Sequence, residues 1–271
     1  MITHGKADTI GPALARLETL AREAAVELVL PEDEVAKHGL ELPEGDPEDA
    51  DVAVVLGGDG TMLRALKRFL GSATPVIGVN FGSVGFLTSI PADDLETGLA
   101  RVFAGDYRVI ELRTLRLEVG GLQESAVNDV VARSSVLGRM VELSWMLGGE
   151  DLGQVPCDGV ICATPAGSTA YNLSNGGPVL VWGLDAMAVS FLAPHSLHAR
   201  PLVVPSGLEL EVANRTRDVG ATLLVDGHPV AEIGTETVAR IRVGEQASLL
   251  GSLPEVTFFR RYGATFAHDS Q

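Results

Sequence analysis

The chain has 271 residues, 46% of them hydrophobic and 21% charged, and its formal net charge is −16 at pH 7. This composition excludes a disordered chain. The negative charge argues against non-specific binding to nucleic acid or to anionic membranes. Two cysteines, Cys157 and Cys162, give no disulfide framework and indicate a reducing compartment. No apolar run reaches membrane-spanning length, and the N-terminus lacks a signal-peptide pattern. We expect a soluble, cytoplasmic protein.

The first hundred residues alternate between helical and strand patterns. A leucine face predicts a helix over 11–24, a strand is expected over 26–30, and the acidic, proline-rich residues 31–50 predict a solvated loop. Apolar strands over 52–56 and 75–80 flank a helix over 61–70, and a further helix is expected over 93–105. Strand, helix and strand within about thirty residues indicate a βαβ unit with a parallel sheet. The first twelve residues show no convincing strand.

After about residue 106 the pattern changes to period two. Alternating segments at 115–119, 140–147, 208–213 and 239–244 are separated by Gly, Pro and Asn, which predicts a β-rich second domain. We therefore expect an α/β domain over 1–105 and a β-rich domain over 106–251. The C-terminal segment 252–271 is expected to return to the first domain.

A glycine turn follows the strand of the first domain, in the stretch VAVVLGGDGTMLRALKRF at 52–69. Gly57 and Gly58 let a ligand approach the main chain, and the free N–H groups of the next helix favour phosphate. Thr61 is a candidate N-cap. The spacing is neither the P-loop nor the dinucleotide fingerprint. An ordinary strand–helix turn, with Asp59 capping the helix, is the structural alternative.

Six stretches occur in the order seen in NAD kinases: GGDGTMLRA (57–65), VNFGSVGFLT (79–88), NDVV (128–131), CDGVICATPAGSTAYNLSNGGPVL (157–180), APHSLHARPLVV (193–204) and VDGH (225–228). Over roughly residues 50–260 the chain resembles a bacterial NAD kinase. GGDGT alone also occurs in lipid kinases of the diacylglycerol type, but its combination with the TPAGSTAY-type stretch is highly specific.

The resemblance implies an α/β plus all-β fold, with an N-terminal Rossmann-like parallel-sheet domain and a C-terminal β-sandwich-like domain that binds NAD. It implies transfer of the γ-phosphoryl group of ATP, or of polyphosphate, to the 2′-hydroxyl of the adenosine ribose of NAD, giving NADP. The active site would lie between the domains. Family members are commonly homodimers or homotetramers.

This chemistry gives the glycine turn its roles. A hydroxyl acceptor must lose a proton, and a carboxylate beside it can orient it and accept that proton, so Asp59 is expected to be the general base. The amides of Gly57, Gly58, Gly60 and Thr61 would receive the donor's phosphates. Mg²⁺ would be held through those phosphates, because no acid cluster resembles a dedicated metal cage; protein ligands for a metal stay unknown.

Two acidic motifs belong to the second domain. Asn128 and Asp129 lie in an apolar segment, where such a pair is costly unless it is hydrogen-bonded or faces a cleft; a strand-end turn is the alternative. The family usually has Asn-Glu here, so the acid is one methylene shorter. Asp158 is either a turn aspartate or, by resemblance, a partner of the nicotinamide end. Pro156 stands where relatives often carry a basic residue.

The stretch TPAGSTAYNLS at 164–174 combines small hydroxylated residues with one aromatic ring. Composition alone favours an ordinary turn, whereas the resemblance favours a loop around adenine with Tyr171 stacking on the base. Arg64 and Arg139 are candidate pyrophosphate cations or surface arginines, and His228 is a ribose contact or a hairpin-turn histidine. The complete set expected to bind substrate is Gly60, Arg64, Phe86, Asn128, Asp129, Arg139, Asp158, Thr169, Ala170, Tyr171, Asn172, Leu173, Ser174 and His228.

Two other classes of function share part of this pattern. A lipid kinase would also carry GGDGT, but the sequence has no basic or amphipathic membrane-facing stretch and its charge opposes anionic lipid. A non-catalytic regulator could hold a dinucleotide with the same amides. Turnover of NAD separates the expected enzyme from both.

Overall fold

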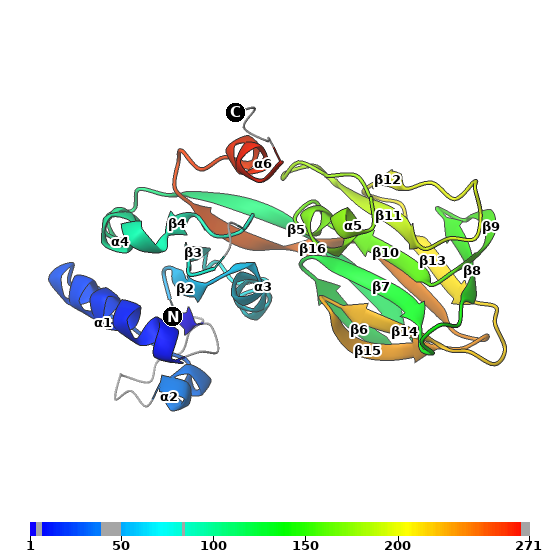
Figure 1. Ribbon diagram of the computed structural model, residues 1–271, viewed down its shortest axis with the longest axis horizontal. Coiled ribbons are helices and arrows are strands. Elements are labelled where there is room, and N and C mark those ends of the chain that lie inside the picture. The colour runs from blue at the N-terminus through cyan, green and yellow to red at the C-terminus, as the bar shows by residue number, and fades with distance from the viewer. Residues whose placement is uncertain (4–6, 39–49, 83–84, 267–271) are drawn as a thin grey trace. The chain divides into compact units, whose positions relative to one another are not determined.

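The computed structural model describes residues 1–3, 7–38, 50–82 and 85–266. The chain forms two compact units, Met1–Glu111 with Ser248–Gln271, and Leu112–Ala247. Two strands, β5 (Arg108–Val119) and β16 (Val238–Ser252), continue from one unit into the other along the chain (Figure 1). Among the described residues, no helix is long and apolar enough to cross a membrane.

The first unit is an α/β unit built on a parallel sheet. Its strands lie in the order β1 (Ile2–Thr3), β2 (Ala53–Gly57) and β3 (Val76–Asn80), and β3 also pairs with β4 (Ile90–Pro91) and with Leu250 of β16. The helices are α1 (Ala7–Glu23), α2 (Glu32–His38), α3 (Asp59–Arg68), α4 (Leu95–Phe103) and α6 (Phe258–Phe266). A 3₁₀ turn, Ala92–Asp94, precedes α4. The predicted βαβ unit is confirmed.

The core of this unit forms between the sheet and the apolar faces of α1 and α4. Leu14 and Leu17 of α1 and Leu99 of α4 are buried with Ile77 and Val79 of β3. Helix α3 buries Met62, Ala65 and Leu66, which recur at helical spacing. Strand β2 ends at Gly57 and α3 begins at Asp59, so only Gly58 lies between two elements that are both fixed by packing.

Four local expectations in this unit are wrong. Residues 26–30 form no strand beyond a single bridge at Leu30, and residues 32–38 form α2 rather than loop. Glu32, Asp33 and Glu34 lie in the first turn of α2, where negative charge favours a helix; the rest of the predicted loop, 39–49, lies outside the described residues. The first strand exists but is only two residues long. Thr61 is not the N-cap, because α3 begins at Asp59 after Gly58.

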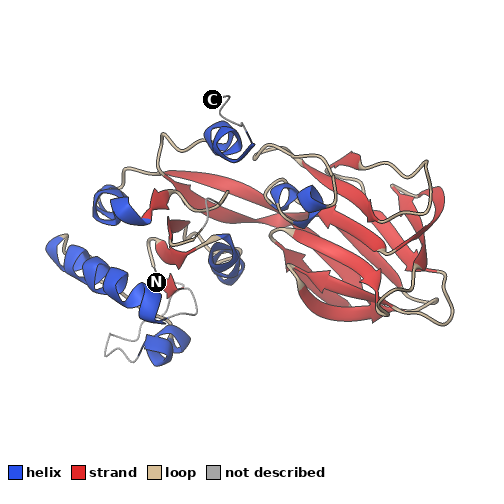
Figure 2. Ribbon diagram, in the orientation of Figure 1, coloured by secondary structure: helices blue, strands red, loops and turns tan. Residues whose placement is uncertain are grey.

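The second unit consists almost entirely of strands (Figure 2). One sheet has the order β12 (Leu202–Pro205), β11 (Ala186–Leu192), β10 (Gly159–Ala163), β7 (Asp129–Ser134), β14 (Ala221–Val225) and β15 (His228–Ile233). The other strands are β6 (Leu122–Ala126), β8 (Val141–Leu147), β9 (Glu150–Cys157) and β13 (Leu210–Asn214).

In this second group β9 pairs with β8, β8 with β13 and β13 with β16, while β6 pairs with β5. One apolar cluster holds inward side chains of both groups, among them Val130, Cys162 and Met187 from the six-stranded sheet and Leu143 and Val212 from the other. Such a shared core is that of a β-sandwich. The predicted fold class, α/β followed by an antiparallel sandwich, is confirmed.

Candidate functional site

The carboxylate of Asp59 lies at the first position of α3 and turns toward a neighbouring loop. Its Oδ2 accepts a hydrogen bond from the backbone N–H of Phe86 at 2.7 Å, and its Oδ1 accepts one from Leu87 at 3.0 Å. The N-cap residue, Gly58, supplies no side-chain hydrogen bond to the helix. Asp59 is thus held by the loop after β3 and does not cap its own helix.

Gly85 is required by this arrangement. A Cβ built on Gly85 would overlap the Asp59 carboxylate, so only glycine lets the loop come close enough for its next two amides to reach Asp59. The sequence contains a signal for this position, since Gly85 belongs to the VNFGSVGFLT stretch. Its structural reason becomes visible only in the fold.

Two expected substrate residues of the first unit contact other parts of the protein, Phe86 as a buried residue and Arg64 as an exposed one. The Phe86 ring is buried and packs against Phe258 and Phe266 of α6, with ring centroids 6.0 Å and 5.8 Å apart. The Nη2 of Arg64 donates to the carbonyl oxygen of Thr3 at 2.9 Å. Phe86 therefore contributes its backbone N–H to the site, while the exposed Gly60 leaves the start of α3 accessible.

In the second unit, Asp226 organises the segment that carries Asn128. Its carboxylate accepts backbone hydrogen bonds from Val127 at 3.1 Å, Asn128 at 2.7 Å and Asp129 at 3.3 Å. The Oδ1 of Asn128 is buried and has no hydrogen-bond partner in the part of the chain that the structure describes. A buried amide oxygen in that state is expected to meet a ligand donor.

Asp129 is buried beside this carboxylate. Burial, and secondly the charge of Asp226, raise the pKa of Asp129 to about 7. The acid is therefore close to half-protonated near neutrality, and in its neutral form it can donate as well as accept a hydrogen bond.

The TPAGSTAYNLS stretch forms a 3₁₀ turn, Gly167–Thr169, and a short helix, α5 (Tyr171–Ser174). Thr164 Oγ1 donates to the carbonyl of Val127 at 2.7 Å and accepts from the N–H of Gly167 at 2.9 Å. A Cβ on Gly167 would overlap the backbone of Asn128. The two expected substrate segments are thus locked to each other.

Asn172 is part of this scaffold. Its side chain is fully buried; Nδ2 donates to the carbonyls of Ser168 and Pro178, and Oδ1 accepts from Ser190 Oγ at 3.0 Å. The polar atoms of the Asn172 side chain are therefore engaged by the protein itself, and the expected contact of Asn172 with the substrate stays a prediction. Thr169 Oγ1 likewise donates to the carbonyl of Ala166, at 3.0 Å, whereas Ala170 and Leu173 are half-buried beside it.

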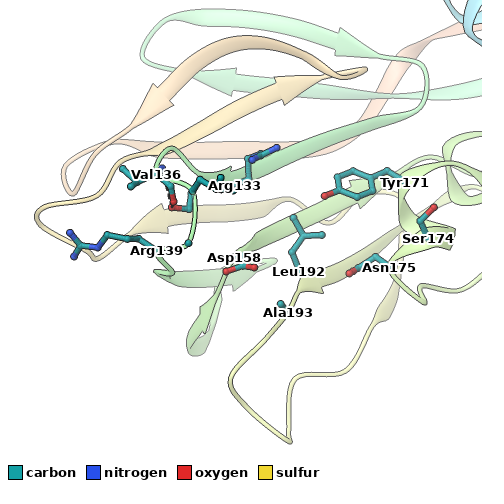
Figure 3. A pocket seen from close by; sticks show the side chains of 12 residues that line it. Arg133, Val136, Arg139, Asp158, Tyr171, Ser174, Asn175, Leu192 and Ala193 are labelled. Atoms are coloured by element: carbon teal, nitrogen blue, oxygen red, sulfur yellow. Dashed lines mark hydrogen bonds between the residues drawn. The ribbon is translucent and has the colours of Figure 1, made fainter.

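A cavity of about 350 Å³ opens beside α5 (Figure 3). Its lining includes Asp158, Tyr171 and Ser174, together with Arg133 and Arg139. The Tyr171 side chain is 43% exposed, so its ring offers a free face. An aromatic face, hydroxyls and cations around one opening suit a nucleoside that carries phosphate.

Two arginines, Arg133 and Arg139, line this cavity. Arg139 Nη2 pairs with Asp218 at 2.7 Å, and this pairing lowers the pKa of Asp218. Arg133 of β7 was not selected from the sequence, because a single arginine in a strand carries no motif. His228, which the resemblance predicts to contact the ribose, is exposed at the start of β15, directly after the Asp226–Gly227 turn.

No group of three or more His, Cys, Asp or Glu side chains in the described ranges is arranged to hold a metal ion. The pKa of Cys157 is raised to about 12 by burial, and that of Cys162 is raised as well. Both thiols are therefore unreactive core residues.

Comparison with known proteins identifies two adjacent family matches. Residues 16–107 match the ATP-NAD kinase N-terminal domain, and residues 127–250 match the ATP-NAD kinase C-terminal domain. The NAD kinase of Gemmatimonas aurantiaca is 36% identical over 236 residues, covering 84% of this chain and 80% of that protein. The NAD kinase of Heliobacterium modesticaldum is 39% identical over 215 residues, covering 78% and 76%.

Two solved structures share the fold. An NAD kinase from Archaeoglobus fulgidus in complex with ATP has a TM-score of 0.75 and 25% identity, covering 94% of this chain and 93% of that one. A yeast NADH kinase complexed with NADH has a TM-score of 0.87 and 21% identity, covering 99% and 87%. The second likeness concerns the fold alone.

Proposed function

The chain belongs to the NAD kinase family, and on that premise we propose that it transfers the γ-phosphoryl group of ATP to the 2′-hydroxyl of the adenosine ribose of NAD. The observation that carries the proposal is the Asp59 carboxylate at the start of α3, fixed by the backbone amides of Phe86 and Leu87 in the loop after β3. Polyphosphate is a second donor that the amides of the glycine turn could bind.

Asp59 is proposed as the general base. A carboxylate has about four lone-pair sites, and the amides of Phe86 and Leu87 use two of them. A further site can accept the hydrogen bond of the ribose hydroxyl and then its proton. The 2′-oxygen forms its bond to the γ-phosphorus, the bond from that phosphorus to the β–γ bridging oxygen breaks, and ADP leaves with that oxygen.

The start of α3 is proposed to receive the donor. Gly58 is the N-cap of the helix and Gly60 lies in its first turn, where free N–H groups and the helix dipole favour phosphate. Mg²⁺ would bind through the donor's phosphates and water, which suits a protein whose described residues show no acid cluster for it. When bound, the ion offsets phosphate charge.

The second unit is proposed to bind the dinucleotide. Tyr171 would stack on a base, and the buried Oδ1 of Asn128 would accept a hydrogen bond from the adenosine part. Asp158 and the arginines of the cavity would meet the remaining polar groups. Assembly into a homodimer or homotetramer, and a cytoplasmic location, stay predictions.

The decisive experiment supplies purified protein with NAD, Mg²⁺ and either ATP or polyphosphate, and measures NADP with an NADP-specific dehydrogenase. We expect NADP with ATP and none in excess chelator. Binding of NAD without turnover with any donor would identify a non-catalytic regulator instead. Phosphorylation of diacylglycerol in preference to NAD would identify a lipid kinase.

A further inference from the structure

Helix α6 places an arginine in the interior of the first unit. The side chain of Arg261 is buried, with 5% of the residue exposed. Burial lowers the pKa of Arg261 to about 10, and the charge of Asp59 acts in the opposite direction. Because a guanidinium loses its hydration when buried, it persists only where hydrogen-bond acceptors replace water.

Those acceptors belong to the loop that holds Asp59. Arg261 Nη1 donates hydrogen bonds to the carbonyl oxygens of Phe86 and Thr88. Arg261 thus binds the carbonyl side of the same stretch of backbone whose N–H groups bind Asp59. The loop residues 86–88 thus lie between a cation and a carboxylate.

One peptide group connects the two charges directly. The carbonyl of Phe86 and the N–H of Leu87 belong to the same peptide plane. The carbonyl accepts from Arg261, and the N–H donates to Asp59 Oδ1 at 3.0 Å. Hydrogen bonds in such a chain polarise one another, so the guanidinium strengthens the donor that faces the carboxylate.

The aromatic face of α6 fixes the same loop from its apolar side. Phe258 and Phe266 pack on the Phe86 ring, and Tyr262 packs on both of them. The loop itself has no strand or helix between residues 85 and 89. The position of this loop is therefore set by α6. Arg261 and Phe86, which are hydrogen-bonded, are 175 residues apart in the sequence.

We propose that Arg261 is a positioning residue for the phosphoryl-transfer reaction: by holding the carbonyls of Phe86 and Thr88, it aims the amides of Phe86 and Leu87 at Asp59 and so keeps the carboxylate in its reactive orientation. This inference rests on the proposed role of Asp59. It assigns to the C-terminal helix a task in turnover rather than in substrate binding.

The test compares Arg261→Met, which keeps the bulk of the side chain but removes every donor, with Arg261→Lys, which retains a charged donor. Arg260→Met is the matched control, because Arg260 is the exposed neighbour on the same helix. Each variant is measured for melting temperature, for NAD affinity by calorimetry, and for kcat with NAD and ATP. The substitution Arg261→Met is also combined with Asp59→Asn in single-turnover assays.

We expect Arg261→Met to lower kcat by about tenfold to a hundredfold, the scale of a small misplacement of a catalytic group, with NAD affinity within about twofold. Arg261→Lys should recover part of the loss and Arg260→Met should match the parent. In the Asp59→Asn background, Arg261→Met should change the residual rate little, since the group that it positions is already disabled.

Two results overturn the inference: a folded Arg261→Met protein with normal kcat, or an equal loss of rate with and without the Asp59 carboxylate. If Arg261→Met fails to fold, the comparison of Arg261→Lys in the two backgrounds decides in the same way. Failure of the proposed function has a separate signature, because the parent protein itself would then make no NADP. Failure of the proposed role of Asp59 would appear as near-normal turnover in Asp59→Asn alone, whatever Arg261 does.

Discussion

Two aspartates, one in each unit, hold a neighbouring loop through backbone amides, and they differ in how much of the carboxylate remains usable. Asp59 accepts two amides and is half-buried. Asp226 accepts three, is buried, and lies in the left-handed region with a φ of 51°. The same hydrogen-bond chemistry therefore supports a proposed catalytic role in one unit and an architectural role in the other.

The difference follows from location on the chain. Asp59 begins a helix whose N–H groups favour anions, so in the proposed reaction the carboxylate would lie beside the phosphate donor. Asp226 occupies a hairpin turn between β14 and β15, where Asp tolerates a positive φ and can reach back to the segment before β7. Substitution of each aspartate should therefore affect a different quantity.

The largest effect is expected for Asp59→Asn. Asparagine keeps the size and one acceptor oxygen but cannot take the proton, and loss of a general base typically costs about 10²–10⁴ in rate. We expect kcat to fall by that factor while NAD still binds in calorimetry. The side-chain NH2 of asparagine would face the backbone N–H of either Phe86 or Leu87, so a lower melting temperature is expected as well. A folded, NAD-binding variant with near-normal turnover would show that this carboxylate is structural.

The next effect is expected for Asp226→Ala, on stability rather than chemistry. Removal of the carboxylate leaves buried N–H groups without an acceptor, and each such loss costs about 1–3 kcal/mol. We expect the free energy of unfolding, measured with urea, to fall by about 3 kcal/mol in total. Asp226→Asn, which keeps an oxygen and accepts the left-handed backbone, should lose less. Equal losses in both variants would mean that the amides of 127–129 find other partners.

These contrasting roles also mark the limits of sequence analysis. The periodicity and the glycine turn were sufficient for β2, α3 and β3, because each element is long enough to show its period. They were insufficient for β1, whose two residues owe their conformation to pairing with Val55 and Leu56. Helix α2 was not predicted, because its acidic residues are as typical of a solvated loop as of the first turn of a helix.

The residues of the candidate site also divide into those that could be selected from the sequence and those that could not. Motif residues such as Asp59, Asn128 and Tyr171 could be selected from the sequence, since their chemistry is local. The partners that hold them could not, because Arg261 meets Phe86 across the fold and Asp226 meets Asn128 through its backbone. The burial of the Asn172 side chain could not be predicted either, because it is a property of packing that no motif expresses.

A smaller effect is expected for Tyr171, which lines the cavity of the second unit. Tyr171→Ala removes an exposed ring, and base stacking on an aromatic is worth about 1–3 kcal/mol. We expect the Kd for NAD to rise by about tenfold to a hundredfold, while Tyr171→Phe, which keeps the ring, stays close to the parent. An unchanged affinity for NAD together with a raised KM for ATP would assign this ring to the donor.

The smallest effect is expected for Asp129, which is buried beside Asp226. Burial raises its pKa to about 7 in the folded protein, whereas an unfolded Asp has a pKa of about 3.9. Between those values the folded state binds more protons, so this residue makes stability fall as pH rises, by at most about 1.4 kcal/mol per pH unit. Asp129→Asn removes that slope.

We therefore expect Asp129→Asn to be more stable, relative to the parent, at pH 8 than at pH 4, by about 1 kcal/mol or more. Urea denaturation at the two pH values measures this difference, and the other carboxylates cancel because both proteins carry them. Asp93→Asn, at an exposed position, is the control and should show no such change. If the gap between the parent and Asp129→Asn is the same at both pH values, the charge of Asp226 and the burial of Asp129 do not govern its protonation. Asp129 would then behave as the ionised partner that the family's glutamate is expected to be.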